Sequence, residues 1–208
     1  KRGHGLSDCP NSPYSMGVLV NDIEALMDTL KLKNSLFIGL SIGGMIAQGL
    51  AVKRLDLVSA MVLSNTAARI GNRQIWEDRI SRVKSSGMKS LTEETMKRWF
   101  SKKFVQSKEI NIWKNMFERQ AAEGYTGCAH AISGTDFYTP TSGLRLPTIA
   151  IAGSEDGSTP PDLVRETCNL IPGSKFNLIK GVGHIPCVEA PKKYSQILSD
   201  FMKELGYV

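Results

Sequence analysis

One serine lies in a stretch whose residue types and spacing predict nucleophilic chemistry. Three large apolar residues, 36–38, lead into Gly39-Leu40-Ser41-Ile42-Gly43, a Gly-x-Ser-x-Gly pattern followed by small residues. This order predicts a buried strand, a very tight turn and a helix, with the hydroxyl of Ser41 pointing out of the turn. We expect a Cβ at Gly39 or Gly43 to collide across that turn. The alternative is a glycine-rich strand-to-helix turn without catalytic function, because the pattern also arises by chance.

Two later residues could activate this serine. A serine hydroxyl is a poor nucleophile unless a base takes its proton, and a histidine does so near neutral pH. His184 follows the last expected strand, and Asp156 follows the strand before it. Asp156 would hold the imidazole in one tautomer and stabilise the imidazolium. The backbone N–H of Ile42 would donate to an oxyanion. The predicted catalytic residues are therefore Ser41, Asp156 and His184.

Each partner of the serine also has a plainer interpretation. Asp156 could be a turn or helix-capping residue, and Glu155 beside it is a rival for the same role. His184 could be a loop histidine with structural hydrogen bonds only. We expect His4, in a glycine-rich loop before the serine, to be structural. The three candidates together, in this order and each at a strand end, favour catalysis.

The elements that must position these residues follow from hydrophobic periodicity. Apolar positions at helical spacing predict a first helix over 16–31, with Ser15 as its N-cap. Strand–helix–strand order with short links predicts a parallel sheet with helices on both faces. Since the loops after parallel strands gather at one edge, the three candidates would converge there. The remaining strands and helices are expected at 57–63, 148–152, 160–170, 175–179 and from 191.

Residues 70–138 interrupt this alternation, because they contain helical patterns and no convincing strand. All three tryptophans lie here. We therefore predict an α/β core, residues 1–69 and 139–208, with a helical cap over 70–138. A cap can exclude water and shape a pocket. The alternative is a packed helical subdomain whose aromatic residues form only its own core.

Composition excludes several classes of protein. The chain has 208 residues, 41% of them hydrophobic, and a net charge of +6 without the aromatic interleaving typical of nucleic-acid binding. It has no apolar run long enough to span a membrane and no signal-peptide pattern. Four scattered cysteines lack metal-ligand spacing and are typical of free thiols in a reducing compartment. We expect a cytoplasmic protein that binds neither nucleic acid nor membrane.

Several motifs resemble those of a known family. The chain is similar to α/β-hydrolases throughout, and within them to the 3-oxoadipate enol-lactonases of the β-ketoadipate pathway for aromatic compounds. Most of the motifs are shared by the whole superfamily, but the stretch that leads into Trp76 is typical of the narrower family. The motifs are Arg2-Gly3-His4-Gly5-Leu6-Ser7, Leu26–Leu30, Gly39–Met45, Leu63–Gly71, the Gly153, Asp156, Pro160 pattern, and Gly183-His184-Ile185.

The resemblance implies hydrolysis of a small anionic enol-lactone through an acyl-enzyme, with no cofactor or metal. The substrate carboxylate would need a cationic partner. Arg69 and Arg73 are the candidates, with Trp76 as an apolar wall. The alternative is that these arginines form surface ion pairs, which contribute little.

The sequence also departs from the family. Members carry further strands before the Arg-Gly-His-Gly loop, including a second oxyanion-hole donor, and these are absent here. We expect an N-terminal part to be missing. Open alternatives are a carboxylesterase, a carbon–carbon bond hydrolase, a perhydrolase, or a ligand sensor on a hydrolase frame. A homo-oligomer and fusion to a decarboxylase module also remain open.

Overall fold

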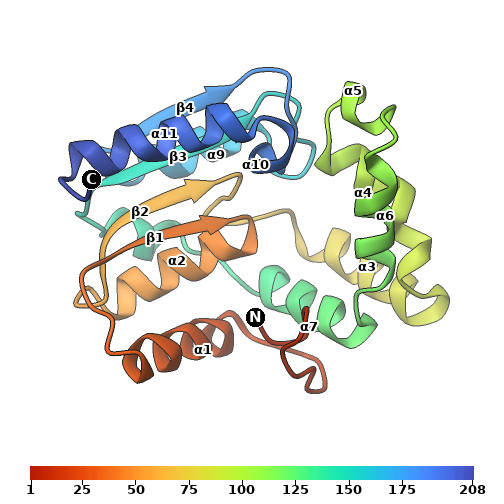
Figure 1. Cartoon of the computed structure of the whole chain (residues 1–208). Coiled ribbons are helices and arrows are strands. Elements are labelled where there is room, and N and C mark those ends of the chain that lie inside the picture. The colour runs from red at the N-terminus through yellow and green to blue at the C-terminus, as the bar shows by residue number, and fades with distance from the viewer.

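The computed structural model describes all 208 residues and centres on a four-stranded parallel sheet (Figure 1). The strands lie in chain order: β1 (Ser35–Leu40), β2 (Val58–Ser64), β3 (Thr148–Gly153) and β4 (Lys175–Ile179). Leu40 pairs with Ser64, and Gly153 pairs with Ile179, so the strands end at nearly the same level. The predicted parallel α/β sheet is confirmed.

Helices cover both faces of the sheet because its side chains alternate between two apolar cores. Met61 and Leu63 of β2 pack in the larger core, and Ala60 and Val62 pack in the smaller one. The larger core includes residues of α1 (Met16–Thr29), α2 (Ile42–Lys53) and α9 (Pro161–Asn169). The smaller core includes Tyr194 and Phe201 of α11 (Pro191–Glu204).

The helix starts follow the expected local chemistry. The Ser15 hydroxyl accepts a hydrogen bond from the Val18 N–H at 3.2 Å, which confirms it as the N-cap of α1. Prolines occupy the first positions of α9 and α11, where the missing N–H has no intrahelical role. A short helix that the periodicity did not predict, α10 (Pro186–Glu189), follows His184.

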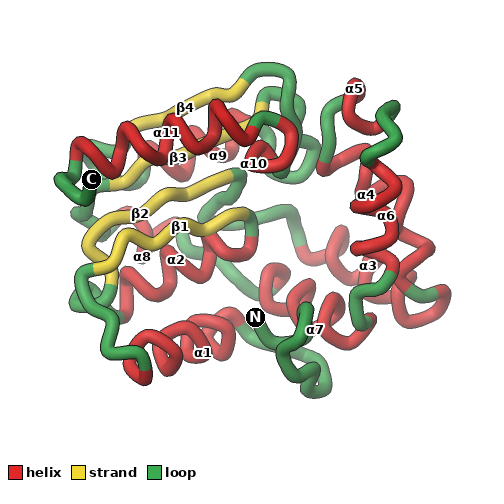
Figure 2. The backbone as a smooth tube through the Cα atoms, viewed as in Figure 1, coloured by secondary structure: helices red, strands yellow, loops and turns green.

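Between β2 and β3 the chain is helical, and Figure 2 shows most of these helices beyond the carboxyl ends of the strands, whereas the last one, residues 138–142, lies beside α2. We call residues 73–142 the helical segment. Part of it packs around a core of its own, which includes Leu91, Phe100 and Phe117. The four predicted helices are present, and α5 and α8 are too short for periodicity to reveal. The helices are α3 (Arg73–Ser86), a 3₁₀ turn (Met88–Leu91), α4 (Thr92–Trp99), α5 (Lys102–Val105), α6 (Ile110–Glu118), α7 (Ala122–Ser133) and α8 (Tyr138–Ser142).

No helix of the structure combines the length and the apolar character that crossing a membrane requires.

Candidate active site

Ser41 occupies a strained turn between β1 and α2. Its φ of 55° and ψ of −121° lie in a region that non-glycine residues rarely adopt. The Ser41 N–H donates to the Ser64 carbonyl at 2.9 Å, and the Thr66 hydroxyl donates to the Ser41 carbonyl at 2.7 Å. The Ser41 hydroxyl makes no capping hydrogen bond to α2. The backbone is therefore held on both sides while the hydroxyl stays free of the helix.

The two glycines of the pattern have different roles. A Cβ at Gly39 would lie 2.3 Å from the Gly43 carbonyl oxygen, so this position requires glycine. A Cβ at Gly43 would meet nothing within 4 Å outside its own helical backbone, so the expected collision there is wrong. The second close approach is at Gly44, where a Cβ would lie 2.4 Å from the Thr66 side chain. The tight packing thus faces the loop that follows β2.

His184 and Asp156 form a buried pair. The Nδ1 atom of His184 lies 2.8 Å from Oδ2 of Asp156, and the two side chains are 4% and 0% exposed. With Nδ1 engaged by the carboxylate, Nε2 is the ring nitrogen left for proton transfer. The rival acid, Glu155, is exposed and accepts a hydrogen bond from the Lys102 N–H at 3.0 Å. The structure therefore brings Asp156, and not Glu155, to the histidine.

Two further residues hold the acid. Oδ2 of Asp156 also accepts hydrogen bonds from the Asn65 amide at 2.9 Å and from the Thr159 hydroxyl at 2.7 Å. Burial raises the pKa of Asp156, but the hydrogen bonds from His184, Asn65 and Thr159 outweigh that effect and lower the pKa below its usual value. Asp156 is therefore ionised at neutral pH and can stabilise a protonated imidazole.

The end of α4 fixes the loops that carry the pair. The Trp99 carbonyl accepts the backbone N–H of His184 at 2.7 Å, and the Arg98 carbonyl accepts the N–H of Gly157 at 3.0 Å. The Trp99 ring lies over the His184 ring at 6.4 Å between centroids and 26° between planes. A Cβ at Gly183 would lie 2.5 Å from the Trp99 carbonyl oxygen, so the contact depends on glycine.

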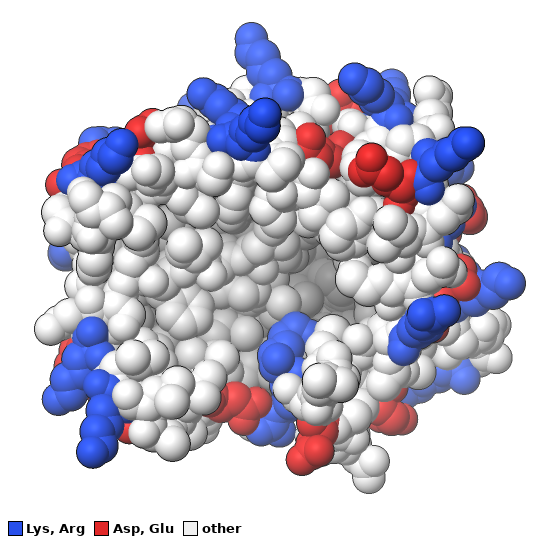
Figure 3. All heavy atoms as spheres, viewed as in Figure 1, with Lys and Arg blue, Asp and Glu red and all other residues white.

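A cavity of about 480 Å³ joins Ser41 and His184. This volume is within the usual range for small-molecule sites. Figure 3 shows that the charged side chains on this face surround an uncharged area, hollowed between the strand ends and the helical segment. Ile42 also lines the cavity, at the first position of α2, where N–H groups have no intrahelical acceptor. Apolar lining residues from the helical segment include Trp76, Trp99 and Phe117.

The expected cationic residues are placed elsewhere. The Arg69 side chain is 53% exposed and lies 3.6 Å from Asp136, and the Arg73 side chain is 84% exposed and pairs with Glu77. Neither lines the cavity, whereas Trp76 does. The expectation that Arg69 and Arg73 face the site is therefore not met, because both turn toward carboxylates on the surface.

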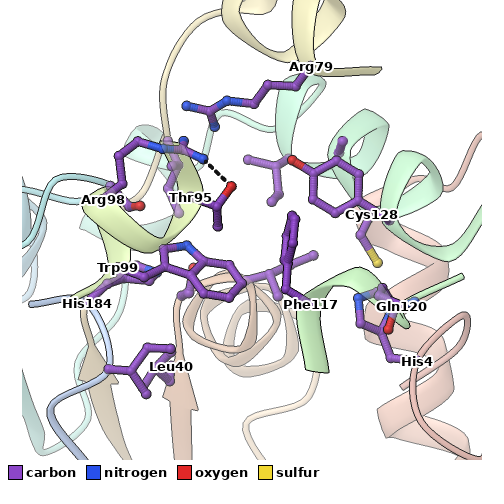
Figure 4. Close-up of a pocket in the computed structure, with 18 of the residues that line it drawn as sticks. His4, Leu40, Arg79, Thr95, Arg98, Trp99, Phe117, Gln120, Cys128 and His184 are labelled. Carbon is purple, nitrogen blue, oxygen red and sulfur yellow. Dashed lines mark hydrogen bonds between the residues drawn. The ribbon is translucent and has the colours of Figure 1, made fainter. Parts of the chain in front are cut away.

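Sequence reasoning missed several residues near the site. Arg79 and Arg98 line the cavity (Figure 4). Arg79 lies three residues after Trp76, a spacing that places both on one helix face and could have pointed to it. Asn65 directly follows β2, which is the same strand-end signal that pointed to Asp156. His4, which we expected to be structural, also lines the cavity, and burial lowers its pKa to about 4, so it is neutral at neutral pH.

Comparisons with known proteins agree with this geometry. The chain matches the alpha/beta hydrolase fold family over residues 2–191. It is 30% identical to 3-oxoadipate enol-lactonase 2 of Acinetobacter baylyi over 207 residues, which cover 99% of this chain and 77% of the relative. The enol-lactonase from Burkholderia xenovorans LB400 superposes with a TM-score of 0.92 at 31% identity, covering 97% and 78% of the two chains. A thermophilic esterase from Thermogutta terrifontis superposes with a TM-score of 0.90 at 26% identity, covering 98% and 77%.

Proposed function

Because the chain belongs to the α/β hydrolase fold family, we propose that it hydrolyses 3-oxoadipate enol-lactone to 3-oxoadipate through an acyl-enzyme. The observation that carries the proposal is the buried His184–Asp156 pair, which shares one cavity with the strained Ser41. The relatives named as enol-lactonases support the opening of a lactone ring. The pathway would be the degradation of aromatic compounds.

In the first step, Ser41 attacks the ring carbonyl carbon while Nε2 of His184 takes the hydroxyl proton. The negative charge that develops on the carbonyl oxygen is stabilised by the N–H of Ile42 and the N-terminal end of α2. The bond between the acyl carbon and the ring oxygen then breaks. The leaving oxygen takes the proton from His184 as an enol, which converts to the ketone, so its departure is easy.

In the second step, water replaces the serine. His184 takes a proton from the water, the resulting hydroxide adds to the acyl carbon, and the carbon–oxygen bond to Ser41 breaks. The Ser41 oxygen recovers its proton from His184, and 3-oxoadipate leaves. Asp156 stays ionised through both steps and stabilises each transient imidazolium. We propose that residues 70–138 act as a cap that limits the entry of bulk water.

A carboxylesterase on the same frame is the second candidate. The similarity to the Thermogutta terrifontis esterase favours it, because that esterase superposes on this chain with a TM-score of 0.90, nearly as high as the 0.92 of the enol-lactonase. Acyl transfer to Ser41 is the same for an ester and a lactone, so the catalytic residues alone do not separate the two substrates. The shape and charge of the cavity would decide between them.

The first prediction concerns Ser41. The protein should consume 3-oxoadipate enol-lactone, and the loss of ultraviolet absorbance measures the rate. Ser41→Ala should lower kcat by about 10⁴-fold or more because no nucleophile remains. A panel of aryl esters serves as the comparison. Faster turnover of simple aryl esters than of the enol-lactone would favour the esterase. Turnover of every substrate by Ser41→Ala at the wild-type rate would exclude the proposed mechanism.

A further inference from the structure

We propose that Arg79 and Arg98 form the subsite that binds the carboxylate of the substrate; this inference rests on the proposed function. Both arginines line the cavity that contains Ser41 and His184. Figure 4 shows them on one side of Trp99 and Phe117, with Leu40, the neighbour of Ser41, on the other side. The reacting carbonyl and the carboxylate would thus occupy opposite ends of the cavity.

Arg98 has hydrogen-bonding capacity that the protein leaves unused. Its side chain is only 18% exposed, and its Nε atom is buried without a hydrogen-bond partner. Its Nη2 donates to the Thr95 hydroxyl at 3.1 Å, and the carboxylate of Glu94 lies 3.8 Å from Nε, too far for a hydrogen bond. Because Nε is enclosed, Nη1, which also has no hydrogen-bond partner in the chain, is the donor that a ligand can reach, and an acceptor there would stabilise the guanidinium.

The guanidinium of Arg79 also has unused hydrogen-bond donors. Its guanidinium carbon lies 4.8 Å from the centre of the Trp76 ring, and none of its guanidinium N–H groups hydrogen-bonds to another residue of the chain. Stacking on the indole orients the planar group and leaves its edge available to an acceptor. Figure 4 shows both guanidinium groups turned toward the same part of the cavity.

The charges around the pair are not balanced by the protein. Arg79, Arg82 and Arg98 gather around the single carboxylate of Glu94, which Arg82 already engages through a hydrogen bond of 2.8 Å. Burial lowers the pKa of Arg98, and the nearby charge of Arg79 lowers it further. An anion in the cavity would relieve this repulsion and accept hydrogen bonds from both arginines.

The backbone fixes this subsite relative to the catalytic residues. The Arg98 carbonyl holds the loop of Asp156 through Gly157, and the Trp99 carbonyl holds His184. The distance between the anion subsite and the base is thus set by two adjacent residues of α4. We therefore expect the enzyme to select a short lactone that carries a carboxylate over a neutral lactone with the same ring.

The second prediction tests this selection with two lactones. One is 3-oxoadipate enol-lactone, and the other is the same ring with a methyl group in place of the carboxymethyl group. In Arg79→Gln and Arg98→Gln, kcat/KM for the anionic lactone should fall about 10- to 100-fold, since a hydrogen bond to a charged group contributes about 1.5–3 kcal/mol. For the neutral lactone it should stay within about twofold. Arg98→Lys should recover part of the loss.

The matched control is Lys84→Gln, which removes an exposed positive charge from the same helix as Arg79. This variant should keep the wild-type kcat/KM for both lactones. An equal fall for both lactones in the arginine variants would assign them a structural role and overturn the subsite. Unchanged kinetics on the anionic lactone would overturn it as well.

Binding separates failure of the subsite from failure of the proposed function. If the wild-type protein opens neither lactone, calorimetry with adipate still measures recognition of a carboxylate. Adipate should then bind the wild-type protein and Lys84→Gln equally and bind Arg98→Gln at least about tenfold more weakly. Absence of adipate binding to the wild-type protein in that case would overturn the subsite.

Discussion

At the scale of single residues, Asp156 is the most constrained side chain of the site. Oδ2 accepts from His184, Asn65 and Thr159, while Oδ1 accepts from the backbone N–H groups of Ser158 and Thr159 at 2.7 and 3.0 Å. A carboxylate held by so many donors keeps one orientation and stays ionised. Asn65 and Thr159 act on the base through Asp156 and are therefore positioning residues.

The third prediction concerns Thr159. Thr159→Val keeps the shape of the side chain but removes the hydroxyl that donates to Oδ2. We expect kcat to fall about tenfold with little change in KM, which corresponds to a loss of about 1.4 kcal/mol in transition-state stabilisation. Thr159→Ser keeps the hydroxyl and should stay within about twofold of the wild type. Steady-state kinetics on the best substrate measure both. A loss of kcat in Thr159→Ser together with a wild-type kcat in Thr159→Val would mean that packing of the methyl group, and not the hydrogen bond, matters.

At the scale of elements, the junction of β1 and α2 determines the geometry of Ser41. The turn is tight because the Gly43 carbonyl approaches the Cα of Gly39, and the helix lies close to the loop after β2 because Gly44 contacts Thr66. The obstacle at Gly39 is backbone, which cannot rotate away like a flexible side chain. The strain at Ser41 is therefore maintained by the packing of two neighbouring elements.

The fourth prediction compares two glycines of this junction. Gly39→Ala should lower the free energy of unfolding by about 1–3 kcal/mol or more, because its Cβ would overlap the Gly43 carbonyl. Gly43→Ala should raise it by about 0.5–1 kcal/mol, because alanine loses less entropy than glycine in a helix. Urea denaturation measures both. Similar effects at the two positions would contradict the asymmetry of the turn.

At the scale of the whole molecule, ion pairs join parts of the chain that lie far apart in sequence. Arg54, after α2, contacts Glu24 and Asp28 of α1 and Asp56 before β2 at 2.8–3.1 Å. Hydrogen bonds from Arg54 lower the pKa of Asp28 and Asp56. The pKa of Glu24 is lowered most by its hydrogen bond from Lys53 and next by the one from Arg54. The cluster ties α1 to the sheet at the end opposite to α3, α4, α6 and α7 (Figure 1).

The fifth prediction concerns the pH dependence of stability. Carboxylates with a lowered pKa in the folded state stabilise it fully above their unfolded pKa of about 4 and lose that effect as pH falls through the folded value. The free energy of unfolding should therefore decrease below about pH 4.5. In Arg54→Gln these pKa values return toward their usual range, so the decrease should be shallower.

Urea titrations at several pH values between about 6 and 3 measure that slope. Lys84→Gln is the control, because it removes one exposed positive charge without touching the cluster, and its slope should match that of the wild-type protein. An unchanged slope in Arg54→Gln would mean that other carboxylates govern the acid sensitivity.

The sequence alone determined the elements and the candidate catalytic residues. Short apolar runs and helical spacing are local properties of the chain, so the four strands, the principal helices and the strand ends that carry Asp156 and His184 were predictable. The Gly-x-Ser-x-Gly turn also depends on neighbouring residues alone, although only one of its glycines proved sterically necessary.

Only the tertiary structure decided which side chains meet. Glu155 and Asp156 are adjacent, but backbone direction at the end of β3 turns one outward and the other toward His184. The packing of α3 and α4 likewise determines which arginines line the cavity, because it turns Arg79 and Arg98 inward. Side-chain direction depends on contacts between distant segments, and no local pattern encodes those contacts.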